Sequence, residues 1–555
     1  MSKVDENAPA GSLPASALHQ EPVPLESDVS LSNSLIWRKQ REFYVQRGLK
    51  AWTEDLVPNF ITNNPFIAEI YARIVFSFLS DCSQSGTSKL VERKSQPLSA
   101  QHPLRILELG AGPGKFSVLF LRRLTALMRA QDIALDTVRY CMTDCSENLI
   151  QAWRTNPYLA EFVESGILEF EFLQAGDEIK CRFASAKTSE ASASTHGPLV
   201  LIANYAFDSL PQDAYVMHEG QIFEALVTTM KPVGSPGDSG TEALSRLQFS
   251  YKNASVPSDR YPEQSWNDIL EAYRSHLSSA TVLFPSATLK TLQELGRCTD
   301  GRMLVLAADK GFVHEDDLPF SQGPPVIEFH GEHCFSQTVN FDAIGKYFKS
   351  MGGQALLPSK HSSNLNICAF VQGASGDQFP ATQAAYQDVQ ASFGPDDLFT
   401  LLAWLNAHME EMSVPQILSV LRLGHWDPVA LVRLFPVLAR QLRTVLRERV
   451  DLRVAVISTW ANHYPIHPSE NIIAFYCGVI LLELRFYEDA LAMFKASQQI
   501  FGGSAATSYN LGLCALGLGH SAEALAYMVE ACGLDPNFEP ARLSRLKLEQ
   551  ENAPA

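Results

Sequence analysis

The sequence predicts an α/β fold with a doubly wound parallel sheet, which follows a helical N-terminal extension and precedes an all-helical array. From residue 104 to residue 371, short apolar segments typical of buried strands alternate with amphipathic segments typical of helices. A glycine-rich turn joins the first of these strands to the first helix. In the last third of the chain, small and apolar residues recur at a spacing of 34 residues, which indicates helical repeats.

The strand segments are short, apolar and bounded by polar or glycine-rich turns. The first ends in glycines, and the helix that follows it places Phe116, Phe120 and Leu124 on one face. The segment from Tyr215 to Val227 alternates about a central Glu-Gly pair, which predicts a β-hairpin. The expected strands of the sheet are residues 104–109, 138–143, 168–173, 199–203, 303–307 and 366–371.

Five segments of the chain differ in composition. The first 33 residues are rich in Pro and Ser and contain one basic residue, Lys3, so they lack the features of a secretory or mitochondrial targeting signal. We therefore expect a disordered tail and a cytoplasmic location. The segments are a disordered tail (1–33), a helical N-terminal extension (34–103), the α/β domain (104–375), a linker (376–395) and a helical repeat domain (396–550).

Two copies of one pattern stand out in the helical repeat domain. The matching residues are Gly478, Leu481, Ala490 and Phe494 in one copy and Gly512, Ala515, Ala524 and Met528 in the other. The pattern resembles the tetratricopeptide repeat, and because a solenoid usually needs at least about three repeats, residues 396–469 should supply further helix pairs. We expect its concave face to bind a peptide or protein partner, and the array to be separable from the active site.

Charge and composition exclude several classes of protein. Lys and Arg total 44 against 61 for Asp and Glu, which gives a net charge of −17, so a general nucleic-acid-binding role is not expected. No stretch approaches the roughly 20 apolar residues that a membrane-spanning helix needs. The ten cysteines include no CxxC pair, so no zinc site or other metal site is expected.

The most informative string is Glu-Leu-Gly-Ala-Gly-Pro-Gly at residues 108–114. Its GxGxG spacing differs from the GxGxxG of dinucleotide-binding sites, and it resembles the first motif of class I S-adenosylmethionine-dependent methyltransferases. The resemblance implies a Rossmann-like methyltransferase domain with S-adenosyl-L-methionine as cofactor. The alternatives are a glycine turn without a ligand and a nicotinamide site. The resemblance places Glu108, Gly110, Ala111, Gly112 and Gly114 at the cofactor.

Two further acids are candidates for cofactor binding. Asp144 ends the second strand, where a carboxylate can accept hydrogen bonds from both ribose hydroxyls. The alternative for Asp144 is to cap the helix that begins near Ser146. Asp177 follows the third strand and is a candidate for the adenine amino group, and its alternative is a solvated loop position.

Further stretches, in the same order along the chain, resemble the MidA-type methyltransferases, the complex I assembly factor group. They are Phe60-Ile61-Thr62, Asp144-Cys145-Ser146, the run from Ala203 to Pro211, Glu224, Asp309-Lys310-Gly311, His330 and Val339-Asn340-Phe341. Members of that group methylate an arginine in a protein of respiratory complex I, which implies a protein side-chain nitrogen as acceptor. Two positions depart from the pattern, because Tyr205 replaces a glutamate and Lys310 replaces a tyrosine.

The residues after the fourth and fifth strands are candidates for catalysis and substrate contact. Asn204 and Asp208 leave the fourth strand at the edge where ligands of open α/β sheets bind. Asp208 can orient or deprotonate the acceptor, and its alternative is to cap the turn before Leu210. Glu328 and His330 belong to an acidic and imidazole cluster that we expect to contact substrate, since its spacing fits no standard metal site.

The sequence therefore predicts an S-adenosylmethionine-dependent methyltransferase that acts on a protein side chain, with the repeat domain recruiting a protein partner. One alternative is a scaffold of repeats that carries a degenerate, non-catalytic methyltransferase domain. A nicotinamide-dependent oxidoreductase is disfavoured by the GxGxG spacing.

Overall fold

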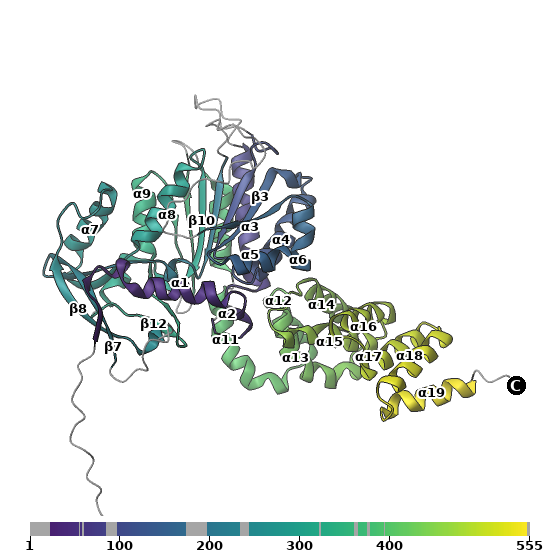
Figure 1. Ribbon diagram of the computed structural model, residues 1–555. Coiled ribbons are helices and arrows are strands. Elements are labelled where there is room, and N and C mark those ends of the chain that lie inside the picture. The colour runs from purple at the N-terminus through teal and green to yellow at the C-terminus, as the bar shows by residue number, and fades with distance from the viewer. Residues whose placement is uncertain are drawn as a thin grey trace, which may run out of the picture.

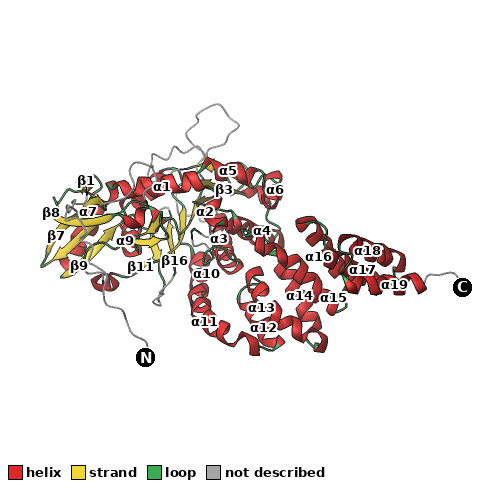
Figure 2. Ribbon diagram, turned by 60° about the horizontal axis from the view of Figure 1, so that its bottom comes forward, coloured by secondary structure: helices red, strands yellow, loops and turns green. Residues whose placement is uncertain are grey.

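The computed structural model describes residues 23–551 except 55, 58–59, 85–96, 174–196, 233–242, 321–322, 360–364, 374–377 and 393. Within these residues the chain has a mixed α/β part followed by a helical C-terminal region (Figure 1). Figure 2 shows strands gathered at one end of the molecule and only helices at the other.

A seven-stranded sheet forms the centre of the α/β part. All six strands expected from the sequence are present, and five of them (β10, β5, β2, β3 and β4) are parallel neighbours, while β16 and β15 add antiparallel pairings at one edge. In spatial order the strands are β15 (Gln354–Leu356), β16 (Asn366–Gln372), β10 (Met303–Asp309), β5 (Leu199–Asn204), β2 (Leu104–Leu109), β3 (Val138–Asp144) and β4 (Leu168–Phe172).

Both faces of this sheet are covered, which explains why its strands are apolar throughout. Ile106 on β2 belongs to the core shared with α3 to α6, whereas its neighbour Leu107 belongs to the core shared with α7 to α9. The helices on the first face are α3 (Pro65–Gln84), α4 (Lys115–Ala130), α5 (Glu147–Arg154) and α6 (Pro157–Glu164). The helices on the second face are α7 (Gln264–His276), α8 (Ser286–Arg297) and α9 (Phe341–Ser350).

A second, antiparallel sheet includes the expected hairpin, which turns at Glu219 and Gly220, both with positive φ. It corrects one expectation, because residues 23–29 of the expected disordered tail form β1 against β7. Glu26 holds this segment by accepting hydrogen bonds from Leu35 N and Thr229 Oγ1. The strands of this second sheet are β1 (Val23–Val29), β7 (Gln221–Lys231), β6 (Asp213–His218), β9 (Ser279–Phe284) and β8 (Gln248–Ser255).

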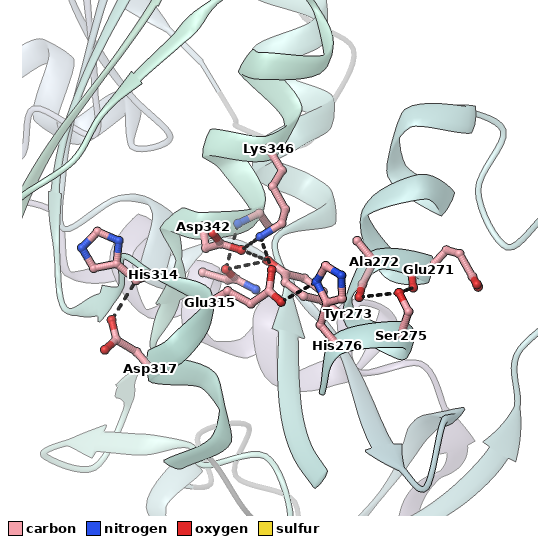
Figure 3. Close-up of polar contacts among 12 residues, drawn as sticks. Glu271, Ala272, Tyr273, Ser275, His276, His314, Glu315, Asp317, Asp342 and Lys346 are labelled. Atoms are coloured by element: carbon pink, nitrogen blue, oxygen red, sulfur yellow. Dashed lines mark hydrogen bonds and ion pairs between the residues drawn. The ribbon is translucent and has the colours of Figure 1, made fainter. Parts of the chain in front are cut away.

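Polar contacts join α7, α9 and the 3-10 helix η6 (Glu315–Phe320) beside the two sheets (Figure 3). Lys346 on α9 forms ion pairs with Asp342 and Glu315. Glu315 Oε1 also lies 2.9 Å from His276 Nδ1. Tyr273 donates a hydrogen bond to Asp342 at 2.6 Å. These contacts fix elements on the face of the sheet opposite α4, so we assign them a structural role.

The N-terminal extension is helical as expected, with α1 (Leu35–Arg47), α2 (Lys50–Thr53) and α3. The expected linker at 376–395 is wrong for most of its length, because residues Pro380–Ala391 form helix α10. Asp81 on α3 accepts hydrogen bonds from Ala381 N and Thr382 N at the start of α10, and Tyr386 is buried in the core. These long-range contacts select a helix in a segment whose composition resembles that of a loop.

The C-terminal region consists of consecutive helices that pack as neighbours along the chain. Gly478 and Gly512 have equivalent environments, since an added Cβ would lie 2.7 Å from Phe494 at the first and 2.7 Å from Met528 at the second. The helices are α11 (Pro395–His408), α12 (Val414–Leu423), α13 (Pro428–Gln441), α14 (Arg449–Ala461), α15 (Ile473–Glu483), α16 (Tyr487–Phe501), α17 (Ala505–Gly517), α18 (Ser521–Leu534) and α19 (Glu539–Glu551).

Candidate active site

A cavity of about 400 Å³ opens at the carboxyl ends of the central parallel strands. There the chain order reverses, because β3 and β4 follow β2 on one side while β5 and β10 lie on the other. Open α/β sheets bind ligands at such a reversal. The residues predicted from the sequence that line this cavity are Glu108, Gly110, Ala111, Gly112, Asp144, Asn204, Asp208, Glu328 and His330.

The glycine loop, residues 110–114, is the floor of this cavity and is fixed by hydrogen bonds from several elements. Ala111 N donates to Thr143 O at 2.9 Å, and Trp153 Nε1 donates to Gly112 O at 2.9 Å. Gly110 has a φ of +68°, and an added Cβ there would meet no atom within 4 Å. The loop therefore leaves open space above Gly110, into which a ligand can approach the backbone.

Glu108 is buried at the end of β2. Its Oε2 accepts hydrogen bonds from Ser117 Oγ at 2.5 Å and from Tyr140 Oη at 2.6 Å. Burial raises the pKa of Glu108 to about 7, although both hydroxyls oppose that shift. A cation in the cavity would stabilise the ionised form of this carboxyl.

Asp144 is buried at the end of β3 and lines the cavity. Its Oδ2 accepts a hydrogen bond from Gly112 N at 3.3 Å, and its Oδ1 accepts one from Ser146 N at 3.1 Å, before the start of α5. Burial raises the pKa of Asp144 to about 6, and these amides oppose the shift. Because a carboxylate can accept about four hydrogen bonds, Asp144 keeps acceptor capacity for ribose hydroxyls.

Asn204 and Asp208, which follow from β5, line the opposite wall, whereas Asp309 at the end of β10 is fully buried and does not line the cavity. Asn204 Oδ1 accepts a hydrogen bond from Tyr71 at 2.8 Å, while Asn204 Nδ2 and Asp309 Oδ1 are buried without a hydrogen-bond partner among the described residues. Burial raises the pKa of Asp208 to about 7, with a smaller contribution from Glu328. Burial, and then Asp208, raise the pKa of Asp309 well above its usual range. Each of these two acids therefore favours its protonated form more than a free carboxyl does when no cation is near.

Glu328 and His330 lie on the short strand β12 (Glu328–His330), at the mouth of the cavity. Glu328 pairs with Lys310 at 2.6 Å, which lowers the pKa of the Glu328 carboxyl. His330 Nε2 lies 2.8 Å from Ser336 Oγ, and burial lowers the pKa of His330. At neutral pH His330 therefore presents a neutral imidazole.

An aromatic wall from α1 and α2 completes the cavity, and the sequence did not single it out. Trp37, Tyr44 and Trp52 line the cavity, and the rings of Tyr44 and Trp52 stack at 6.0 Å. Tyr44 also lies 3.0 Å from Cys334 Sγ, which belongs to the same wall. The only available signal was the run of aromatic residues in the N-terminal extension, and that run is also compatible with an ordinary helix packing face.

Gly114 is the one predicted cofactor residue among the described residues that does not line the cavity. Gly114 begins α4 with a φ of +81°, and an added Cβ would lie 3.1 Å from Met142 and 3.3 Å from Tyr464 Oη. Its lack of a side chain therefore makes room for protein atoms, and the expected contact of Gly114 with the cofactor stays a prediction. Asp177 lies outside the described residues.

The residues present fit S-adenosyl-L-methionine. The cavity volume is within the range of about 300–1,000 Å³ typical of small-molecule sites. The loop gives a ligand access to the backbone at Gly110. The buried carboxyl of Glu108 suits an ammonium group, and that of Asp144 suits ribose hydroxyls. Asn204 Nδ2, which has no hydrogen-bond partner among the described residues, offers a donor.

The part of the chain that the structure describes contains no group of three or more His, Cys, Asp and Glu side chains able to hold a metal ion. In the same residues, no helix combines the length and the apolar character that crossing a membrane requires.

Residues 89–343 match the model of a protein family. That family is described as "putative S-adenosyl-L-methionine-dependent methyltransferase". The matched range contains the glycine loop, Asp144, Asp208 and His330, and it ends before the helical C-terminal region. The predicted cofactor, S-adenosyl-L-methionine, is confirmed by this match. No curated protein matches the chain.

Three solved structures are similar to the chain at low identity. An uncharacterised protein from Burkholderia thailandensis is 12% identical, with 64% of this chain and 90% of that one covered and a TM-score of 0.38. A protein of the same superfamily from Burkholderia thailandensis, bound to S-adenosyl-homocysteine, is 15% identical. The match covers 63% of this chain and 74% of that one, with a TM-score of 0.33. The CMeT domain of the citrinin polyketide synthase is 13% identical. The match covers 49% of this chain and 46% of that one, with a TM-score of 0.21.

Replacing Gly112 with valine should abolish cofactor binding while the protein stays folded. Gly112 has a φ of +54°, and an added Cβ would lie 3.0 Å from the Trp52 ring, so a branched side chain distorts the loop and its aromatic cover. Isothermal titration of wild type should show binding of S-adenosylmethionine and S-adenosylhomocysteine but not of NAD.

Gly166→Val is the control, because Gly166 has a φ of +74°, has no described atom within 4 Å of its Cβ position and lies outside the cavity. Undiminished binding by a folded Gly112→Val protein would overturn the site.

Cofactor affinity should rise with pH between about 5 and 8. The pKa of Asp144 is about 6 and that of Glu108 about 7, so both carboxyls are protonated at the acid end, where they accept fewer hydrogen bonds. A ligand that needs the ionised forms must displace those protons, and this cost disappears as the pH passes each pKa. S-adenosylhomocysteine titrations across this range should show the rise, and Asp144→Asn should lose the part centred near pH 6. A flat profile for wild type would contradict these ligand roles.

Proposed function

We propose that this protein is an S-adenosylmethionine-dependent methyltransferase that methylates a nitrogen of a protein side chain, of arginine type. The observation that carries the proposal is the pairing of two walls in one cavity: the glycine loop with Asp144 on one side, and Asn204 with Asp208 on the other. The resemblance to MidA-type methyltransferases supports the arginine-type acceptor, and so does Asp208 in the cavity wall, because carboxylates bind guanidinium groups well.

The chain's own residues supply alignment and proton transfer. When bound, S-adenosylmethionine supplies a methyl group on a positively charged sulfur. Asp208, with a pKa of about 7, is partly ionised at neutral pH and is suited to accept the proton that the acceptor nitrogen loses. Asn204 Nδ2 has no hydrogen-bond partner among the described residues, and in this proposal it orients the acceptor or the cofactor carboxylate.

Asp208→Asn should lower methyl transfer by about 10²–10⁴-fold, the usual contribution of a proton acceptor, while cofactor affinity stays within a few-fold of wild type. The measurement is transfer of labelled methyl from S-adenosylmethionine to arginine-containing protein, with S-adenosylhomocysteine titrated in parallel. Asp316→Asn, on the exposed surface of η6, is the control and should change neither value. Loss of cofactor binding and thermal stability together would instead make Asp208 a structural turn residue.

A non-catalytic scaffold is the second candidate, and two residues favour it. Tyr205, with a φ of +49°, stands where the MidA-type pattern has an acid, and burial raises its phenol pKa, so it carries no charge. Lys310, in place of a tyrosine, neutralises Glu328 at 2.6 Å. Cofactor binding with no methyl transfer to any protein acceptor would support this alternative.

Recruitment of a protein partner by the helical region is part of the proposal. Four exposed apolar side chains follow one face of α14 and the residue stretch before it, and we call this set the α14 surface. Between residues 440 and 453 there are five arginines and two acidic residues, and three of these arginines pair with acids elsewhere in the chain, Glu410, Glu483 and Asp489. An acidic, amphipathic segment of a protein acceptor complements such a surface. The α14 surface consists of Leu446 (86% exposed), Val450 (63%), Val454 (52%) and Ile457 (41%).

Val450→Glu should lower methylation of the protein acceptor several-fold and leave S-adenosylhomocysteine affinity unchanged, because a negative charge here repels an acidic partner segment. Val163→Glu is the matched control, since Val163 is a 44% exposed valine on α6. Equal methylation by wild type and Val450→Glu would show that the α14 surface does not recruit the acceptor.

A further inference from the structure

The segment between α14 and α15 reaches the glycine loop of the α/β part. Tyr464 in this segment is 3% exposed and belongs to the same core as α3 and α4. Its ring packs at 5.2 Å from that of Tyr158 on α6. The sequence predicted a helical region separable from the active site, whereas the structure buries one of its tyrosines beside the cofactor loop.

The Tyr464 hydroxyl makes two hydrogen bonds there. It donates to Pro113 O at 2.5 Å, and it accepts from Asn156 Nδ2 at 2.7 Å. The same oxygen lies 3.3 Å from the Cβ position of Gly114, so a side chain at this position would crowd it. One hydroxyl from the helical region therefore holds the backbone carbonyl that lies between Gly112 and Gly114.

Neighbouring contacts keep Tyr464 in this position. Lys115, the first residue of α4, is 3% exposed at its side chain and pairs with Glu470 at 3.2 Å. Arg122, two turns further along α4, donates to Ala461 O at the end of α14 at 2.7 Å. Both ends of the segment that carries Tyr464 are thus attached to the helix that begins at the glycine loop.

Glycine-rich backbone loses more conformational entropy on ordering than any other backbone, so a preorganised loop binds its ligand more tightly than a mobile one. We propose that Tyr464 is a positioning residue that holds the glycine loop in its ligand-binding conformation, and that the helical region is therefore part of the cofactor site. This inference rests on the proposed cofactor binding at the glycine loop.

The first test is Tyr464→Phe in the full-length protein, which keeps the buried ring and removes only the hydroxyl. Losing one hydrogen bond of about 0.5–1.5 kcal/mol predicts S-adenosylhomocysteine binding about 2- to 12-fold weaker, at temperatures well below unfolding. In methyl transfer, the KM for S-adenosylmethionine should rise while kcat at saturation is unchanged, a split that general destabilisation does not produce. Tyr509→Phe, a half-buried tyrosine on α17, is the matched control and should bind like wild type.

A second variant reaches the same hydroxyl from the α/β side. Asn156 caps α6 through Oδ1, which accepts from Tyr158 N at 2.9 Å, so Asn156→Asp keeps the cap and replaces the Nδ2 donor with an acceptor. The Tyr464 hydroxyl has one hydrogen, and an adjacent carboxylate would take it from Pro113 O. Weaker S-adenosylhomocysteine binding by Asn156→Asp is therefore expected as well.

The outcomes separate this inference from the proposed function. If wild type binds neither S-adenosylmethionine nor S-adenosylhomocysteine, the proposed function fails. If wild type binds and both Tyr464→Phe and Asn156→Asp bind equally well, the positioning role is wrong and the proposed function stands. If both variants weaken binding and Tyr509→Phe does not, the helical region contributes to the cofactor site.

Discussion

The conformation of the glycine loop is the constraint on which the rest of this structure depends. Gly110, Gly112 and Gly114 all have positive φ, which gives the loop backbone access to a ligand but also makes it costly to order. The structure surrounds the loop with partners from β3, α5 and the segment before α15. A loop with so little intrinsic stiffness keeps its shape because separate parts of the chain hold its carbonyls and amides.

Burial of acidic side chains is the second organising feature. Glu108, Asp144, Asp208 and Asp309 are all buried at one end of the parallel sheet, and burial raises the pKa of each. Keeping ionised carboxylates out of water is expensive unless a cation or hydrogen-bond donors compensate. A site of this kind favours ligands that carry positive charge, which suits both a sulfonium cofactor and a guanidinium acceptor in the proposed reaction.

Much of the candidate site could be predicted because its residues come directly after strands. Asp144 and Asn204 end β3 and β5, and the glycine loop follows β2, so recognising the strands was enough to bring these residues to one edge. Spacing alone did not show that the missing side chain of Gly114 makes room for Met142 and Tyr464, because a glycine can make room for a ligand or for the protein itself. The aromatic wall was missed because Trp37 and Trp52 reach the cavity only through the packing of α1 and α2.

The sequence by itself determined every strand of the main sheet except β15, the glycine loop and the change to an all-helical region, since these depend on local apolar patterns and on glycine spacing. Only the tertiary structure decided that residues 23–29 pair with β7, that residues 380–391 are helical, and that Tyr464 contacts Pro113. Each of these features is stabilised by partners at least about 200 residues away along the chain, such as Thr229 for Glu26 or Asp81 for Thr382. Local propensity is weak in such segments, so contacts made only in the folded chain select their conformation.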